Sequence, residues 1–335
     1  MAKPNPYYDS QKSHHTPTGF RNMDPEVRIG GDLWRWRRER RAAGLPRPPT
    51  EGYDAFARHW RVQPDFKFGA SAASQTAVWW LGHATVLLRI NGLHIITDPH
   101  LSQRASPLPF LGPERKVAAP TSAQELPQVD VALVSHSHYD HLDVKTVRQL
   151  LRANPDVLFF VPLGLAPWFK ARGINTVHEL DWWDRYEHRE LEIHCVPAQH
   201  WSARTLFDRN RTLWCGWVVR ATGFSFYFSG DTGYTPHLAE IAMRLGSPNF
   251  AALPIGAYEP RWFMRGQHVN PDEAVRLHRE LCIHQSLAIH WGTFELADDS
   301  LDQPVTALRQ ALLEREVHEN QFWILRQGES RLIAA

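Results

Sequence analysis

Short apolar runs, each ended by a turn, dominate the chain from about residue 76 onward. Runs this short that are rich in Val, Ile, Phe and Trp predict β-strands. The expected strands are Ala77–Leu81, Thr85–Ile90, Leu93–Thr97, Val131–Val134, Val157–Val161, Leu191–Val196, Thr212–Ala221, Phe224–Ser229, Phe250–Ile255, Ser286–Ile289 and Phe322–Leu325. Asn91-Gly92 supplies a hairpin turn between the second and third of these runs.

Segments with helical periodicity lie between the apolar runs. We expect helices at about 143–153, 164–172, 235–245, 271–281 and 302–315. Strands that arrive in meandering sets with helices between them bury their apolar faces best as two sheet layers covered by helices.

The first seventy residues have a different, loop-like pattern with helices expected only at about 30–43 and 52–61. Between Arg28 and Arg41, arginines alternate with tryptophan, and residues 1–60 hold 11 Lys and Arg against 7 Asp and Glu. We therefore divide the chain into an N-terminal extension, 1–70, and a catalytic domain, 71–335. The extension either packs on the main domain or contacts anionic lipid headgroups.

Composition narrows the class of protein. Of 335 residues, 43% are hydrophobic and 22% charged, and the formal net charge of +1 gives no general attraction to nucleic acid. The three cysteines are odd in number and widely spaced, which favours a reducing, cytoplasmic compartment. No secretory signal and no apolar run of the ~18 residues that a bilayer requires are present, so membrane association is expected to be peripheral.

The most specific chemical signal is the sequence Ser-His-Ser-His-Tyr-Asp-His at 135–141, directly after an apolar run. It crowds His136, His138, Asp140 and His141 onto one loop at the end of a strand. Such crowding costs desolvation and charge repulsion unless a divalent metal binds these groups. Zinc is the default for nitrogen and oxygen ligands of this kind, with manganese or iron also open.

Three further candidate ligands each follow an apolar run: His200, Asp231 and His290. If the runs are strands of neighbouring sheets, their ends meet at a shared edge. We therefore expect these three side chains to join the 136–141 cluster.

This order of residues, HxHxDH, then His, then Gly-Asp-Thr, then His, resembles the metallo-β-lactamase superfamily of αββα metallohydrolases. Four further motifs are similar to the N-acylphosphatidylethanolamine-hydrolysing phospholipase D family and its bacterial relatives. They are Trp80–Thr85, Thr97-Asp98-Pro99, Pro254–Met264 and Gln267–Pro271. The resemblance is strong over residues 75–300 and weaker before them, where Asn5–Tyr8 and His15–Asn22 are similar.

The resemblance implies an α/β (α+β) fold, an αββα sandwich of two mixed β-sheets flanked by helices. It also implies a two-metal centre, in which Asp231 bridges the ions. One ion would be held by His136, His138 and His200, and the other by Asp140, His141 and His290. The implied activity is hydrolysis of N-acylphosphatidylethanolamine to N-acylethanolamine and phosphatidic acid. Electron-transfer diiron relatives carry Glu where this chain has His138, which argues against a redox role.

Roles follow for residues around the metals. Asp140 and Asp231 would orient the nucleophile, and His268 would donate a hydrogen bond or proton to the phosphate or the leaving group. Substrate contacts are expected from Tyr258, Arg261, Arg265, Trp201 and Arg204. Supporting contacts to the ligands are expected from Asp98, His83 and Thr232; an aspartate beside a ligand histidine fixes its tautomer.

Other functions stay open at this point. The same centre serves lactonases and other phosphodiesterases. A member of another class would be a catalytically inactive metal-binding peripheral membrane protein. The expected partner is a phospholipid or other phosphodiester, and the sequence leaves a homodimer open.

Overall fold

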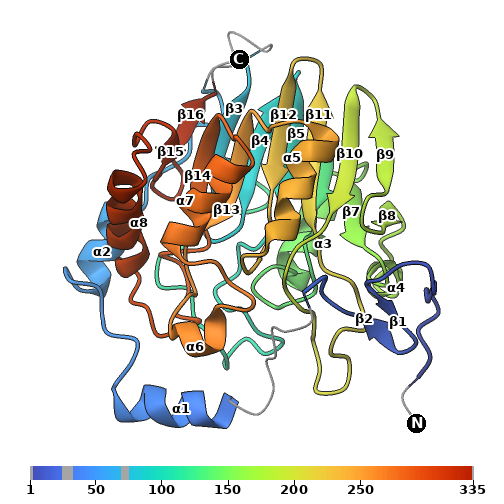
Figure 1. The fold of residues 1–335 in the computed structure, drawn as a ribbon. Helices are drawn as coiled ribbons and strands as arrows, with labels where there is room; N and C mark the ends of the chain where they lie inside the picture. The colour runs from blue at the N-terminus through green and yellow to red at the C-terminus, as the bar shows by residue number, and fades with distance from the viewer. Residues whose placement is uncertain (1–2, 25–32, 69–74, 334–335) are drawn as a thin grey trace.

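Two seven-stranded sheets stack face to face, with helices on their outer faces (Figure 1). This is a computed structural model that describes residues 3–24, 33–68 and 75–333. The first sheet has the strand order β16-β3-β4-β5-β6-β7-β8, and the second has the order β15-β14-β13-β12-β11-β10-β9. Both sheets combine parallel and antiparallel pairs, so the expected sandwich of two mixed sheets is confirmed.

The strands of the first sheet are β3 (Ala77–Trp80), β4 (Val86–Ile90), β5 (Leu93–Thr97), β6 (Val131–Leu133), β7 (Leu158–Pro162), β8 (Val177–Leu180) and β16 (Ser330–Leu332). Those of the second are β9 (Arg185–His188), β10 (Leu191–Val196), β11 (Gly216–Ala221), β12 (Phe224–Phe228), β13 (Phe250–Pro254), β14 (Gln285–Ile289) and β15 (Phe322–Trp323). The short strands β1 (His15–Thr16) and β2 (Gly19–Phe20) form a separate hairpin.

The helices are α1 (Leu33–Ala42), α2 (Tyr53–His59), α3 (Val144–Ala153), α4 (Ala166–Lys170), α5 (Ala239–Leu245), α6 (Arg261–Met264), α7 (Pro271–Glu280) and α8 (Gln303–Glu314), with a 3₁₀ turn at Pro236–Leu238. Local chemistry sets where two of them begin. The Asp143 carboxylate accepts from the backbone N–H groups of Lys145 and Thr146 at the start of α3. At the start of α7, Asn270 and Glu273 form a reciprocal capping box.

The core explains why the strands are apolar on both faces. Along β3, Val78 and Trp80 face the second sheet, whereas Ala77 and Trp79 belong to the layer that packs against α3 and α4. Trp217 on β11 crosses between the sheets, and its indole N–H donates to the Val134 carbonyl at 3.0 Å. The central sheets are therefore covered on both sides, as in other α/β folds with parallel strands.

The described N-terminal residues pack on the main domain. Phe20 and Phe56 are buried in the same core as the sheets. Lys12, His14 and His15 all contact the Asp181 carboxylate, at 2.6, 2.7 and 2.9 Å. Among the described residues, no helix is long and apolar enough to cross a membrane.

Several elements differ from the sequence prediction. The strand expected at 212–221 begins only at Gly216, because Leu213 and Cys215 donate their backbone N–H groups to the carbonyls of Leu163 and Ser135 instead of to a neighbouring strand. The edge strands β9 and β16 and the short α6 were not expected, since polar residues dominate them or they are too short to show periodicity. The expected helix at 30–43 begins outside the described residues.

Candidate metal centre

The candidate ligands lie on loops that leave the carboxyl ends of strands from both sheets. The loop of residues 134–142 follows β6, and Asp98 follows β5 beside it in the first sheet. In the second sheet, His200 follows β10, Asp231 follows β12 and His290 follows β14. These strands run in the same direction, so their ends meet at one edge of the sandwich. The structure thus brings together candidate ligands up to 154 positions apart, from His136 to His290.

Three histidines form the first group. His138 Nδ1 lies 2.7 Å from His136 Nε2 and 3.2 Å from His200 Nε2. The outward atoms of two of these rings are held by neighbours. Ser135 Oγ lies 2.9 Å from His136 Nδ1, and the Gln267 carbonyl lies 2.9 Å from His200 Nδ1. The three nitrogens that face one another are therefore His136 Nε2, His138 Nδ1 and His200 Nε2.

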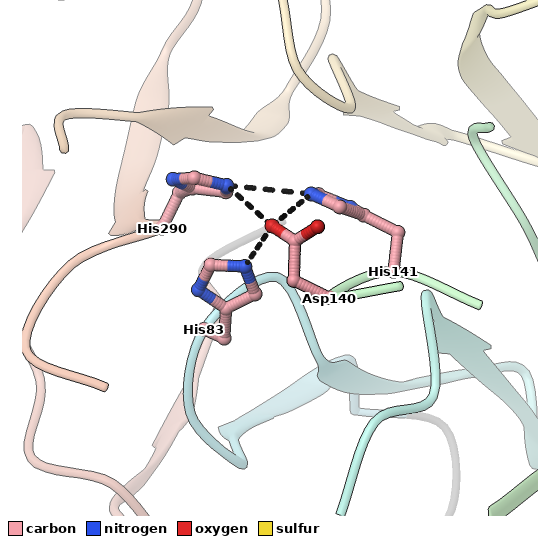
Figure 2. Close-up of side chains that lie close together, drawn as sticks. All are labelled: His83, Asp140, His141 and His290. Atoms are coloured by element: carbon pink, nitrogen blue, oxygen red, sulfur yellow. Dashed lines mark hydrogen bonds and ion pairs between the residues drawn. The ribbon is translucent and has the colours of Figure 1, made fainter. Parts of the chain in front are cut away.

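The second group consists of His83, Asp140, His141 and His290 (Figure 2). The Asp140 carboxylate lies 3.0 Å from His83 Nε2, 3.2 Å from His141 Nε2 and 3.5 Å from His290 Nε2. His141 Nε2 and His290 Nε2 are 3.3 Å apart. His83 is thus in direct contact with Asp140, as close as any other member of the group.

Asp231 lies between the two groups. One carboxylate oxygen is 3.1 Å from His141 Nε2 and 3.7 Å from His200 Nε2. The other oxygen is 3.2 Å from His290 Nε2 and has no hydrogen-bond partner among the described residues. A carboxylate in this position can contact ions bound on either side of it.

A buried aspartate orients one of the imidazoles. Asp98 is fully buried and accepts from His141 Nδ1 at 2.6 Å, from the Ser135 N–H at 2.6 Å and from the Ser135 hydroxyl at 2.5 Å. This contact directs His141 Nδ1–H at Asp98 and leaves Nε2 as the nitrogen that faces Asp140 and Asp231. This is the contact expected of an aspartate that supports a metal-binding histidine.

Burial and mutual repulsion keep the first group neutral. Burial lowers the pKa of His138 to about 4 and that of His200 to about 3, and it holds the pKa of His136 well below its usual value. In the second group, burial also holds the pKa of His83 well below its usual value, but His141 and His290 differ. There, burial is outweighed by Asp231, Asp140 and Asp98, which raise the pKa of His141, and by Asp231 and Asp140, which raise that of His290 to about 9. The protein therefore stabilises positive charge at this place.

The donor set fits divalent cations. Three neutral imidazole nitrogens that face one another cannot all donate hydrogen bonds, whereas all three can bind one cation. Burial alone would raise the pKa of Asp140 and Asp231, but the surrounding histidines hold both well below the usual range. Both carboxylates are thus ionised and available as ligands. The arrangement has the nitrogen and oxygen donors that zinc and neighbouring transition metals prefer.

A groove of about 700 Å³ opens onto the cluster. The polar part of its lining includes His138, Asp140, Asp231 and His268, together with Arg37, Tyr139, Arg209 and Gln267. Its apolar walls include Trp36 from α1 and are completed by Trp201, Phe263, Met264 and Leu296.

The structure distributes the other predicted residues unevenly around this groove. Trp201 lines it and packs edge-on against His138, with ring centroids 4.3 Å apart. His268 also lines it, with Nδ1 3.9 Å from Asp231. Thr232 lies behind the site: its hydroxyl accepts from the Gln199 N–H and its carbonyl accepts from the Val269 N–H, which ties two loops of the site together.

Four expected substrate contacts do not line the groove. Tyr258 is buried beside Asp299, which accepts from its backbone N–H. Arg261 is paired with Glu273 at 2.7 Å and also donates to the His268 carbonyl, so its guanidinium supports the loop instead of facing the groove. Arg265 is exposed at the end of α6. Arg204 donates to the carbonyls of Ser137 and Leu142 and lines a different cavity.

Three supporting residues were missed by the sequence analysis. Ser135 links Asp98 to His136, and the Gln267 carbonyl orients His200. The Asn22 side chain accepts from the His200 N–H at 3.1 Å and from the Trp214 indole at 3.0 Å. Asn22 belongs to a motif noted in the sequence, but nothing in the sequence indicated that it reaches a ligand 178 positions away.

Comparison with known proteins agrees with this geometry. A family model described as "Beta-lactamase superfamily domain" matches residues 94–291. N-acyl-phosphatidylethanolamine-hydrolyzing phospholipase D 1 of Caenorhabditis elegans is 43% identical over 262 residues, which are 75% of this chain and 74% of that protein. The chain belongs to the beta-lactamase superfamily. Within it, the nematode relative places the chain in the family of N-acylphosphatidylethanolamine-hydrolysing phospholipases D, so the chain is an enzyme, a metal-dependent hydrolase.

Two more distant relatives extend the comparison. The mitochondrial N-acyl-phosphatidylethanolamine-hydrolyzing phospholipase D of Saccharomyces cerevisiae is 35% identical over 232 residues, 67% of this chain and 49% of that protein. Among solved structures, isothiocyanate hydrolase from Delia radicum gut bacteria matches with a TM-score of 0.63 and 22% identity, over 77% of this chain and 100% of that one. This second likeness establishes the shared fold.

Proposed function

We propose that this metal-dependent hydrolase cleaves a phosphodiester, namely N-acylphosphatidylethanolamine, to give N-acylethanolamine and phosphatidic acid. The main support is the nematode phospholipase D, which is 43% identical over 75% of this chain, together with the family model, whose match at residues 94–291 contains all seven proposed ligands. The groove adds support, because its apolar walls suit acyl chains and the ionisable side chains in its lining suit a metal-bound phosphate.

We propose two metal ions, zinc by default, in the centre. His136, His138 and His200 would hold one ion, Asp140, His141 and His290 the other, and Asp231 would bridge them. His83 would support the site by holding the Asp140 carboxylate, which its Nε2 contacts at 3.0 Å. Bound there, the metals would supply Lewis acidity to a water nucleophile and to the phosphoryl oxygens.

The chain's own groups would then position the reactants. Asp140 and Asp231 are ionised and line the groove, so each can orient a water molecule and accept a proton from it. Asp98 would keep the His141 proton on Nδ1, so that Nε2 could bind a metal ion.

His268 would contact the substrate as a neutral imidazole. Burial lowers its pKa to about 3, so it does not carry an extra proton at neutral pH. Its Nδ1 has no hydrogen-bond partner among the described residues, and the side chain lines the groove. We therefore assign it a hydrogen bond to a phosphoryl oxygen or to the leaving oxygen, instead of full proton donation.

We also propose that the N-terminal part, 1–70, brings the groove to a lipid surface. Helix α1 is anchored by Trp36, whose indole donates to Asp298 at 3.0 Å, whereas Trp34 is 75% exposed. Helix α1, helix α6 and the loop between β10 and β11 extend on the same side of the molecule (Figure 1). That loop carries Leu206 and Phe207, exposed at 93% and 92%. Exposed apolar side chains beside arginines suit an anionic bilayer interface.

The decisive experiment identifies the bond that is cleaved. The metal-loaded enzyme is incubated with N-acylphosphatidylethanolamine in vesicles, and products are separated and identified by mass spectrometry. We expect equimolar N-acylethanolamine and phosphatidic acid, and no product from His138→Ala, which should also bind less metal. Bis(p-nitrophenyl) phosphate and lactones are tested in parallel. Turnover of a lactone with no lipid product would replace the proposed substrate, and a metal-loaded enzyme inert on every diester would contradict it.

A further inference from the structure

A second cavity, of about 670 Å³, shares Tyr139 with the catalytic groove and is otherwise lined by different residues. Its walls come from α3, from the residues after α4, from the segment 102–109 and from Arg204. We call it the basic pocket, after the cationic side chains in its lining. These are Arg104, Lys145, Arg148, Arg152, Arg172 and Arg204.

Helix α3 supplies half of this charge. Lys145, Arg148 and Arg152 are spaced by three and four residues, so they share one exposed face of the helix. Val147 and Leu150 lie on the buried face. Like charges at these spacings repel each other and weaken a helix. The sequence therefore holds a charge arrangement that costs stability unless an anion binds there.

The protein itself does not neutralise the pocket. Among the described residues, no carboxylate lies within 4.0 Å of the charged groups of Lys145, Arg148, Arg152, Arg172 or Arg204. Arg104 is the exception, since it pairs with Glu114 at 3.1 Å. The acidic residue in the lining, Asp143, is occupied as the cap of α3, where it accepts from two backbone N–H groups and the Thr146 hydroxyl.

Two of the arginines are held in place without a counter-anion. Arg204 donates to the Ser137 and Leu142 carbonyls at 2.7 and 2.9 Å and lies 4.0 Å over the Tyr139 ring. Arg172 lies 4.0 Å over the Trp168 ring and donates to its carbonyl at 2.9 Å. Burial lowers the pKa of Arg204 to about 10, because the charged guanidinium loses hydration in this position. Fixed guanidinium groups lose little entropy when they bind an anion.

We infer that the basic pocket binds a ligand with two or more negative charges on phosphate groups. Guanidinium groups match phosphate oxygens in geometry, and five cations without an ion pair, set against the one carboxylate of Asp143 in the lining, leave more positive charge than a single monoanion can neutralise. The ligand is either a soluble phosphorylated molecule or the headgroup of an anionic phospholipid. This role lies outside the proposed reaction, because none of these arginines contacts a proposed metal ligand through its charged group.

The test uses the full chain and two paired variants. Arg148→Gln/Arg152→Gln removes two exposed charges from the pocket. Arg279→Gln/Arg309→Gln removes the same charge from exposed positions on α7 and α8, outside the N-terminal part, and serves as the matched control. Binding of fructose 1,6-bisphosphate is measured by calorimetry at low and moderate salt. Co-sedimentation is measured with phosphatidylcholine vesicles, with and without phosphatidic acid.

We expect the pocket variant to bind at least one of the two probes about tenfold more weakly than wild type and control, and the difference to shrink as salt rises. Loss confined to the bisphosphate indicates a soluble ligand. Loss confined to phosphatidic acid vesicles indicates the lipid headgroup, and loss of both indicates that the pocket accepts either. If the pocket variant matches the control on both probes, the pocket is not an anion site. Calorimetry and sedimentation do not require turnover, so this outcome is distinct from failure of the proposed activity.

Discussion

Replacing Asp98 by asparagine changes the proton that His141 carries while it preserves the shape of the side chain. In the wild-type protein, the Asp98 carboxylate accepts from His141 Nδ1 at 2.6 Å, so Nδ1 keeps its proton and Nε2 is the nitrogen that can give up its proton to bind a metal ion. An asparagine amide nitrogen in that place donates, which forces Nδ1 to accept and moves the proton to Nε2. A protonated Nε2 cannot bind a metal ion.

The size of the effect follows from the burial of Asp98. Outer contacts of metal-binding histidines are generally worth ten- to hundredfold in metal affinity, or about 1.4–2.7 kcal/mol. The asparagine oxygen can still accept from the Ser135 N–H, but its NH₂ group faces both the Ser135 hydroxyl and His141. Asp98 is fully buried, so water cannot relieve the mismatch. We therefore expect a loss near the upper end of that range, about a hundredfold.

Metal affinity is measured by competition with a chromophoric chelator, and metal content by elemental analysis after dialysis. Asp130→Asn is the matched control. Asp130 also pairs through its carboxylate, with Arg189 at 2.8 Å and the His94 N–H at 2.9 Å, but it precedes β6, at the opposite end of the sheet from Asp98. Metal affinity of Asp98→Asn within twofold of wild type would refute the orienting role.

Three other predictions follow from the same structure. Removing metal with a chelator should lower Tm by about 5 °C in a scan at a thousandfold excess of metal over Kd, and restoring metal should recover it; an unchanged Tm contradicts a folded-state metal site. Asp181→Asn should lower the free energy of unfolding at pH 7 by about 2–3 kcal/mol in urea titrations. Burial alone would raise the pKa of Asp181, but the hydrogen bonds from His14 and Lys12 outweigh burial and lower it. The carboxylate therefore stabilises the fold above its unfolded pKa of about 4, and the difference in unfolding free energy between wild type and variant should shrink as the pH falls below that value. Trp34→Ser should weaken co-sedimentation with anionic vesicles several-fold, whereas Met243→Ser, an equally exposed apolar position on α5, should not; equal effects of both changes argue against a lipid contact by α1.

The sequence predicted those parts of the molecule whose signals are local. The strand Leu191–Val196 and the strand Leu93–Thr97 have the predicted bounds, because apolar runs bounded by turns set them. Candidate ligands at strand ends were recognisable because strands of one direction end at one edge of a sheet. The pairing of Asp98 with His141 was anticipated in kind from the residue types.

What the sequence did not predict depends on distant partners. Arg261 resembles a phosphate-binding residue until Glu273, twelve positions on, is seen to pair with it. Tyr258 lies in the motif near the groove, yet the bonds from backbone N–H groups to Asp299 turn this loop so that the tyrosine is buried. The Arg261–Glu273 pair and the turn around Asp299 do not change the hydrophobic periodicity of the sequence. Each depends on a single side chain from another part of the chain.

The closeness of the two sheets at the metal centre depends on a residue without a side chain. Gly230 precedes Asp231 and has a φ of +59°, a conformation that favours glycine. A Cβ at this position would lie 2.6 Å from the Ser135 Cβ and 2.9 Å from the Cys215 carbonyl oxygen. The loop after β12 therefore touches the loop after β6 through its backbone. Beside this contact, the Asp231 carboxylate, from one sheet, lies 3.1 Å from His141 Nε2, from the other. The position of Asp231 between the two groups of candidate ligands thus depends on close backbone packing between the sheets, since the short aspartate side chain could not span a wider gap.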